Sequence, residues 1–330
     1  MASLAGSFYL LFDSVLLESR LSSSAQVDAD QIKLFASATL RGGVRASANL
    51  KSDTSLGVRT AEGNGGLPKV LLSSVRGSEA EIYLFGACIT SWKPAGGKDL
   101  LFLRPDAVFN GQKPISGGIP HCFPQFGPGP MQQHGFARNL EWNLLDSENS
   151  RDEPAVTLKL EDSLYTRSMW DFGFQALYKV RLQGKSLSTS LTITNTDLKP
   201  FSFTTALHTY FRASISGALV KGLKGCRTLN KDPDPTNPVE GKEERDVVTF
   251  PGFVDCIYLG ASNELLLENG LGDTLTIKNT EYAAGQMLSC GIQIRRWNPV
   301  IENLSVSKML RLELFKWSLG NHGLQSSTFP

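Results

Sequence analysis

The sequence predicts an all-β protein built as a sandwich or barrel of short strands. Segments in which apolar and polar residues alternate recur along the chain, and residues 155–160 are the clearest, with Val156, Leu158 and Leu160 on one face. No window shows an apolar period of 3.6 residues over the length of a helix. Frequent turns separate the alternating segments, which is typical of sandwiches and barrels.

The expected strands start after a glycine-rich junction at residues 62–66 (EGNGG). In chain order, the alternating segments that we interpret as strands are 80–85, 155–160, 176–182, 187–194 and 274–277. Residues 183–186 (QGKS) predict a β-hairpin, because a glycine-containing turn joins two strand-like segments there. We therefore divide the chain into a leader (1–66), a β-sandwich (67–282) and a tail (283–330).

The composition excludes several classes of function. The chain has 330 residues and a net charge of +1, so it carries no broad basic field for nucleic acid or anionic lipid. No run reaches the roughly 18 apolar residues of a membrane span. Five cysteines without a CxxC pair and four scattered histidines favour neither a disulfide framework nor a zinc site. We expect no metal, no nucleic-acid partner and no membrane partner.

The leader has the composition of a targeting segment. Residues 31–51 contain four basic residues and no acidic one, within a serine-rich N-terminal region. This is typical of an organelle transit peptide and predicts a chloroplast location. Four acidic residues among residues 1–30 count against that interpretation. The alternative is a disordered N-terminal tail on a cytoplasmic protein.

A loop over residues 111–130 contains five prolines and the adjacent pair Gly117 and Gly118. Glycine permits close approach of the backbone and proline stiffens the chain. Long loops rich in both are usually functional, although a simple surface excursion stays open as the alternative.

Three segments carry groups suited to sugar chemistry, namely 115–127 (ISGGIPHCFPQFG), 132–139 (QQHGFARN) and 206–211 (ALHTYF). The imidazoles of His134 and His208 could transfer protons near neutral pH. The guanidinium of Arg138 suits a phosphate or sugar hydroxyls, and the amides suit hydroxyls. Each histidine alone would more often be structural than catalytic.

In this order and spacing, the three segments resemble the glucose-6-phosphate 1-epimerase (hexose-phosphate mutarotase) branch of the aldose 1-epimerase family, in its plastid-type plant form. Residues 86–92 (GACITSW) and 253–259 (FVDCIYL) resemble two further segments of that branch. The resemblance covers roughly residues 67–282. It implies a galactose-mutarotase-like β-supersandwich that binds its sugar on a concave sheet face and needs no cofactor.

The resemblance also implies a mechanism that interconverts the α and β anomers of a sugar. A carboxylate removes the proton of the anomeric hydroxyl while a histidine protonates the ring oxygen, so that the ring opens, rotates about C1–C2 and closes again. By resemblance His208 is the general acid, Gln133, His134 and Arg138 line the site with Arg138 on the phosphate, and Asp255 holds sugar hydroxyls.

The sequence departs from this pattern before the Gly-Gly pair. Ser116 stands where better-known members have an arginine, so a bidentate phosphate contact is lost. Arg104 or Lys113 could partly replace it. The preference for a hexose 6-phosphate over a free hexose is therefore open at this point.

The tail departs further, because the Cys-Val-Glu segment that supplies the family's base is missing. Residues 305–309 (SVSKM) can be encoded by TCTGTGTCGAAAATG, which reads Cys-Val-Glu-Asn in a shifted frame, and residues 286–291 and 317–324 permit similar matches. We therefore expect residues from about Ala283 to Pro330 to be out of frame and the sandwich to be incomplete at its C-terminus. Such a tail should pack poorly, with at most local structure in the apolar run 309–315.

Glu302 and Glu313 are the only carboxylates of the tail, and neither lies in a matching motif, so we assign the base to neither. Two functions follow. The first is a monomeric isomerase that interconverts the anomers of a hexose 6-phosphate and is impaired in this chain. The alternative is a non-catalytic carbohydrate-binding module, which the missing base and Ser116 favour. Either would take a sugar or sugar phosphate.

Overall fold

The computed structural model describes residues 56–198, 201, 203–214, 216–232, 234–251 and 254–282, together with the backbone of strands at 12–14, 31–41, 291–297 and 309–313. Across these ranges the regular structure is almost entirely β-strand, with one short helix, α1 (Leu164–Met169), and the 3₁₀ turns η2 (Asn64–Gly66) and η3 (Ala137–Asn139). The all-β prediction is confirmed. No helix within these ranges is long and apolar enough to cross a membrane.

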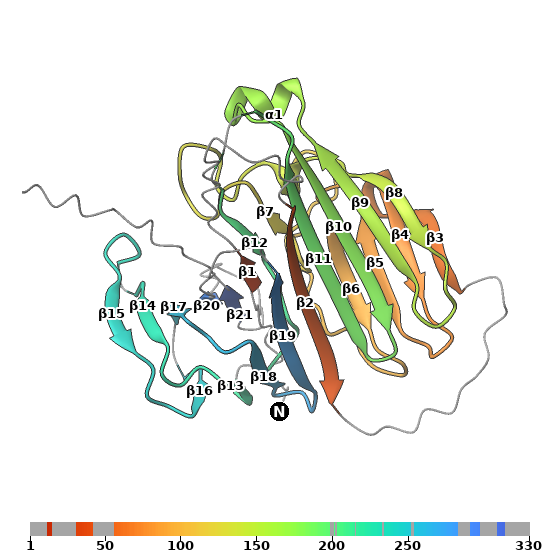
Figure 1. The fold of residues 1–330 in the computed structure, drawn as a ribbon. Coiled ribbons are helices and arrows are strands. Elements are labelled where there is room, and N and C mark those ends of the chain that lie inside the picture. The colour runs from red at the N-terminus through yellow and green to blue at the C-terminus, as the bar shows by residue number, and fades with distance from the viewer. Residues whose placement is uncertain are drawn as a thin grey trace, which may run out of the picture.

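The largest sheet of the described structure is antiparallel and has nine strands (Figure 1). In spatial order they are β16 (Val247–Thr249), β13 (Ala218–Lys221), β18 (Glu264–Asn269), β19 (Thr274–Tyr282), β2 (Gln31–Arg41), β11 (Ser186–Asn195), β10 (Phe174–Gln183), β9 (Ala155–Glu161) and β8 (Asn143–Glu148).

Three smaller sheets accompany it. A four-stranded sheet has the order β3 (Gly57–Glu62), β4 (Pro68–Ser73), β5 (Glu79–Tyr83) and β6 (Cys88–Lys93). A five-stranded sheet has the order β15 (Val239–Lys242), β14 (Arg227–Asn230), β17 (Asp255–Leu259), β20 (Gly291–Trp297) and β21 (Met309–Glu313). A three-stranded sheet has the order β1 (Phe12–Ser14), β12 (Thr205–Leu207) and β7 (His121–Cys122).

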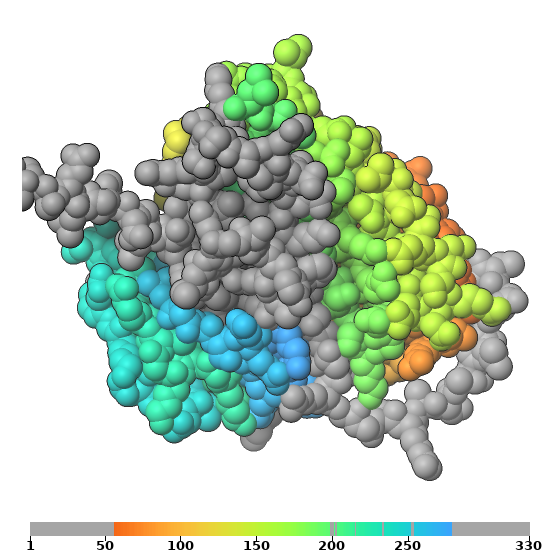
Figure 2. All heavy atoms as spheres, viewed as in Figure 1, coloured from red at the N-terminus to blue at the C-terminus, as the bar shows by residue number. Residues whose placement is uncertain are grey.

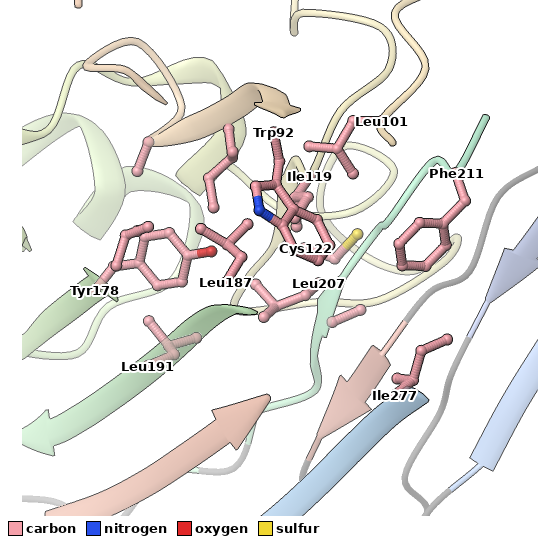
Figure 3. Packing of buried hydrophobic residues seen from close by; sticks show 14 of the residues in the cluster. Trp92, Leu101, Ile119, Cys122, Tyr178, Leu187, Leu191, Leu207, Phe211 and Ile277 are labelled. Carbon is pink, nitrogen blue, oxygen red and sulfur yellow. The ribbon is translucent and has the colours of Figure 1, made fainter. Parts of the chain in front are cut away.

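The core lies between the nine-stranded and four-stranded sheets. Every second residue of β10 is buried, as period-2 alternation requires of a strand with one face in a core. Figure 3 shows Tyr178, Leu187 and Leu191 from the large sheet on one side of Trp92 of β6, and Ile119 and Cys122 of the motif loop on its other side. The long loop therefore contributes to the core and is not a surface excursion.

The hairpin expected between residues 176 and 194 is confirmed. β10 and β11 pair along their whole length, from Phe174↔Asn195 to Gln183↔Ser186. The turn consists of Gly184 and Lys185, and Gly184 has φ 52°, a left-handed value that favours glycine. Figure 2 shows the side chains of β8 to β10 (yellow-green) on one flank of the molecule and those of the β14–β15 hairpin (cyan) on the opposite flank.

The described structure begins upstream of the boundary expected at residue 67. β3 pairs with β4 from Gly57↔Ser73 to Glu62↔Pro68 and forms one edge of its sheet. Edge position explains why the alternation is hard to recognise, since most positions of β3 are exposed or half-buried and Val58 is the only large apolar residue. β1 and β2 also fall within the predicted leader.

Two segments of the tail are strands as well. β21 pairs with β20, and β20 pairs with β17. The local structure expected in the run 309–315 is present as β21. β20 was not expected, although its sequence has a short apolar alternation at Ile292 and Ile294. Glu302 and most of the segments used for the reading-frame hypothesis lie outside the described residues, so that hypothesis stays a prediction.

Candidate functional site

The first and third motif segments lie side by side and run antiparallel. β7 pairs with β12, with Leu207 opposite His121. Backbone hydrogen bonds continue past these strands, because the N–H of His208 donates to the carbonyl of Pro120 at 2.9 Å and that of Tyr210 donates to Gly118 at 2.8 Å. This ladder connects the glycine-proline loop directly to His208.

His208 lies at the point where β12 ends. The N–H of Thr209 donates to the carbonyl of Leu207 at 2.9 Å, which closes a three-residue turn with His208 at its centre. The imidazole is buried, with its ring centroid 5.0 Å from that of Tyr210 and 5.2 Å from that of His134. The turn therefore brings His208 against the second motif segment.

The second segment is held by an unusual backbone at His134 and Gly135, whose φ values are 71° and 68°. Left-handed backbone at a histidine is uncommon, and such residues concentrate at functional sites. The N–H of His134 donates to the carbonyl of Gly127 at 3.0 Å. In return, the N–H of Gly127 donates to Nδ1 of His134 at 3.1 Å.

The bond from Gly127 determines the tautomer of His134. Because Nδ1 accepts a hydrogen bond from a backbone N–H, it carries no proton, and the neutral ring has its proton on Nε2. His134 can therefore donate one hydrogen bond from Nε2 to a ligand oxygen, and it would have to break the Gly127 bond to become a cation. This geometry suits a positioning residue better than a general acid.

Gln125 organises the loop that leads to His134, a role that the sequence did not indicate. Its side chain is 7% exposed. Its Nε2 donates to the carbonyls of Gly127 at 3.1 Å and Met131 at 3.3 Å, and its Oε1 accepts from the N–H of Met131 at 3.1 Å. Its Nε2 also donates to the carbonyl of Gln132 at 3.4 Å, and a buried carboxamide bonded to four backbone groups fixes the loop conformation. The role of Gln125 in the loop could have been found only by predicting that its side chain is buried.

Arg138 and Gln133 lie together. Nη2 of Arg138 donates to the backbone carbonyl of Gln133 at 2.7 Å, and the side chain of Gln133 is exposed. The Nε of Arg138 is buried and makes no hydrogen bond within the described part of the chain. The guanidinium is thus fixed through Nη2, and a planar guanidinium carries several donors suited to an anion.

Arg104 is beside Ser116, but its guanidinium is already engaged. The N–H of Arg104 donates to the carbonyl of Ser116 at 3.0 Å. Its Nε and Nη2 bind Asp106 at 2.8 and 2.5 Å, and this contact lowers the pKa of the Asp106 carboxyl. Arg104 would have to leave Asp106 to bind a phosphate. Lys113 is exposed, with its N–H bonded to Asn110 Oδ1 at 3.1 Å.

Asp255 is buried at the start of β17, in the five-stranded sheet, whereas His208 follows β12 of the three-stranded sheet. Its carbonyl accepts from the N–H of Lys231 at 2.7 Å. The side chain of Glu243, also buried, binds the guanidinium of Arg245 at 2.8 and 2.7 Å, and this pair lowers the pKa of Glu243. No group of three or more His, Cys, Asp or Glu residues in the described ranges could hold a metal ion.

Gly118 allows the motif loop to lie directly on β6. Its φ is 68°, and a Cβ at this position would lie 2.1 Å from the carbonyl oxygen of Ile89. We expect Gly118→Ala to lower the free energy of unfolding by at least about 3 kcal/mol, because left-handed strain of roughly 1–2 kcal/mol adds to a backbone clash. Urea denaturation measures the loss.

Gly127→Ala is the matched control for that substitution. Gly127 has a similar φ of 72°, but a Cβ there would meet nothing within 4 Å. This variant should show only the left-handed strain of about 1–2 kcal/mol. Equal losses for the two variants would contradict the close approach of Gly118 to β6.

The layered antiparallel sheets, with the histidine-bearing loops packed against them, define a protein of the galactose mutarotase-like fold. A family model described as aldose 1-epimerase matches residues 68–285. The chain belongs to the aldose 1-epimerase family.

Relatives and solved structures agree with this assignment. A protein of Cenchrus ciliaris named "Putative glucose-6-phosphate 1-epimerase" is 38% identical over 212 residues, which span 61% of this chain and 64% of the relative, less than two thirds of its length. A protein of the same name from Escherichia coli K12 is 37% identical over 226 residues, or 67% of this chain and 71% of the relative. The crystal structure of a "putative mutarotase" from Salmonella typhimurium superposes with a TM-score of 0.63 at 24% identity, covering 82% of this chain and 90% of that one, and shows the fold alone.

Proposed function

We propose that this protein binds a hexose 6-phosphate and that its site is built to interconvert the α and β anomers by acid–base ring opening. The observation that carries the proposal is the placement of His208, which a turn at the end of β12 brings within 5.2 Å of His134 between ring centroids. The names of the relatives, which specify glucose 6-phosphate, support the same substrate.

In this proposal the residues take the roles that the resemblance implies, within the geometry described above. His208 donates a proton to the ring oxygen as the bond between C1 and that oxygen breaks, and takes it back when the ring closes on the other face. His134 donates a hydrogen bond from Nε2 to a sugar oxygen, because its Nδ1 is committed to Gly127. Arg138, whose Nη2 is held by the carbonyl of Gln133, supplies the positive charge that binds the phosphate.

The proposed reaction also needs a carboxylate base, and this chain has no residue in a matching motif for it. The Cys-Val-Glu segment that the resemblance implies is absent from the sequence. Of the two tail carboxylates, Glu302 lies outside the described residues and Glu313 is described only as the end of β21. The proposed activity therefore depends on restoring the shifted reading frame after about residue 282.

The test is to compare this chain with a version whose tail is read in the shifted frame. Anomerisation of pure α-glucose 6-phosphate, followed by polarimetry, should match the spontaneous rate with this chain and exceed it at least about 100-fold with the restored one, since a positioned acid–base pair typically contributes 10²–10⁴-fold. Equal acceleration by both chains would show that this chain has its own base.

The absent segment also favours a second function, a carbohydrate-binding protein without catalysis. Isothermal titration with glucose 6-phosphate, run beside the kinetic assay, separates the two. Binding without acceleration in both the original and the restored chain would favour the binding protein.

A prediction on specificity concerns Arg138. We expect Arg138→Ala to weaken the binding of glucose 6-phosphate about tenfold or more and that of glucose only slightly, because a charge-assisted contact to an anion contributes about 1.5–3 kcal/mol. Lys98→Ala, which removes an exposed charge outside the three motif segments, is the matched control and should change neither affinity by more than about threefold. Equal losses for both sugars in Arg138→Ala would place that residue away from the phosphate.

A further inference from the structure

The nine-stranded sheet depends on a strand from the N-terminal region. β11 pairs with β10 on one side, and β19 pairs with β18 on one side, but β11 and β19 do not pair with each other. β2 lies between them and joins the two halves of the sheet (Figure 1). Its register runs from Gln31↔Thr194 to Thr39↔Ser186 on one edge and from Lys33↔Tyr282 to Arg41↔Thr274 on the other.

The residue types of β2 match this register. We call the space between the facing edges of β11 and β19, which β2 occupies, the slot. The two flanking strands carry five buried apolar residues beside it, namely Leu187, Leu191 and Ile193 of β11 and Leu275 and Ile277 of β19. The positions of β2 opposite these five residues are all apolar. Ala38, Leu34 and Ile32 pair with Leu187, Leu191 and Ile193 of β11, and Leu40 and Ala38 pair with Leu275 and Ile277 of β19.

The other face of β2 has the opposite character. Its positions are Gln31, Lys33, Phe35, Ser37, Thr39 and Arg41, of which only Phe35 is apolar. On β11 they pair with polar residues such as Ser188, Ser190 and Thr192. Because side chains alternate between faces, a slip of one residue would put the polar set of β2 against the core. The segment therefore fits the slot in this register and not in the neighbouring ones.

Loss of β2 would divide the sheet. The remaining pairings leave one group of four strands, β16-β13-β18-β19, and another, β11-β10-β9-β8. Nine residues of β11 and nine of β19 would lose their backbone partners. Two long unpaired edges beside buried apolar residues are an aggregation hazard, and folded proteins avoid them.

We propose that residues 31–41 are an integral strand of the folded protein and that the slot between β11 and β19 is a site for an extended segment with this alternation, occupied by the chain's own N-terminal region. Any removal of a leader then has to take place upstream of Gln31. The basic composition of residues 31–51, which suggests a targeting peptide, does not conflict with this structural role, because Lys33 and Arg41 fall at positions of the polar face.

The experiment uses the full chain with a protease site inserted after Ala46, in the connection between β2 and β3. After cleavage, the N-terminal fragment should elute with the rest of the protein in size-exclusion chromatography under native conditions. The melting temperature should stay within a few degrees of that of the uncut chain. If the fragment separates and the remainder keeps the melting temperature of the intact protein, another segment fills the slot and the proposal is wrong.

Two further measurements guard against a variant that does not fold. Hydrogen exchange in the unmodified chain should show amides of residues 31–41 protected as strongly as those of β10, since opening β2 requires disruption of the sheet. Exchange at the rate of a free peptide would overturn the proposal. In the cleavable chain, Ala38→Pro should release the fragment, because proline removes a ladder donor from a central strand, whereas Ser24→Pro, outside β2, should not.

Discussion

Replacement of His208 by glutamine is expected to lower the rate of anomerisation at least about 100-fold in the chain with the restored frame, the low end of what general acid catalysis contributes. Glutamine has a similar size and can form a hydrogen bond, but it cannot transfer a proton at neutral pH. Polarimetry on α-glucose 6-phosphate measures the loss, and titration calorimetry should show that binding of the sugar changes little.

His121→Phe is the control for that experiment. His121 lies in β7, which pairs with β12 just before His208. Its ring is buried in the core against Trp142 and Tyr178. It should leave the rate unchanged. If His208→Gln keeps nearly full activity, or if both variants lose activity equally, His208 is not the acid.

Local alternation was sufficient to predict those strands that have one buried face and regular partners. The hairpin of β10 and β11 is the clearest case, since the buried positions of β10 follow the period of two without interruption and the two strands pair along their whole length. Residues 31–41 show the same alternation, but their basic composition favoured a targeting peptide. Their position next to β11 depends on a pairing between residues more than 140 positions apart in the chain. Sequence spacing alone does not specify such a pairing.

The candidate site was predictable as a set of segments and less so as a set of roles. The resemblance of the motifs predicted that His134 and Arg138 line the site, and the structure places His134 beside Gly127 and His208. The engagement of Arg104 by Asp106 and the tautomer of His134 depend on side-chain conformations, which no spacing rule supplies. The motif segments contain three histidines, and residue type alone does not show that His121 is buried in the core whereas His134 and His208 adjoin each other.

We expect His121 to make the folded protein lose stability in acid. The side chain is fully buried, with its ring stacked on Trp142 at 5.1 Å and against the edge of Tyr178 at 4.2 Å between centroids. Neither ring nitrogen makes a hydrogen bond of normal geometry within the described part of the chain. This burial lowers the pKa of His121 to about 3.

The sign of the effect follows from where the proton binds. Above pH 6.5, His121 is neutral in both the folded and the unfolded chain and has no influence on the pH dependence. Between pH 6.5 and about 3, the unfolded chain binds a proton that the folded chain excludes, so the free energy of unfolding falls by up to about 1.4 kcal/mol per pH unit. Between pH 7 and pH 4 the loss from this one group amounts to roughly 3 kcal/mol.

Two substitutions at His121 separate titration from burial. The free energy of unfolding is measured by urea denaturation of the wild type, His121→Phe and His121→Asn at pH 7, 5 and 4. Between pH 7 and pH 4 the wild type should lose roughly 3 kcal/mol more than either variant. At pH 7, His121→Phe should equal or exceed the wild type, since it keeps the aromatic contacts and removes two buried polar atoms. His121→Asn should be less stable at pH 7, because it leaves a polar group in the core and loses the stacking on Trp142. If the three proteins lose stability in parallel between pH 7 and pH 4, the imidazole of His121 takes up its proton in the folded state as readily as in the unfolded one, and burial between Trp142 and Tyr178 cannot be what keeps it neutral.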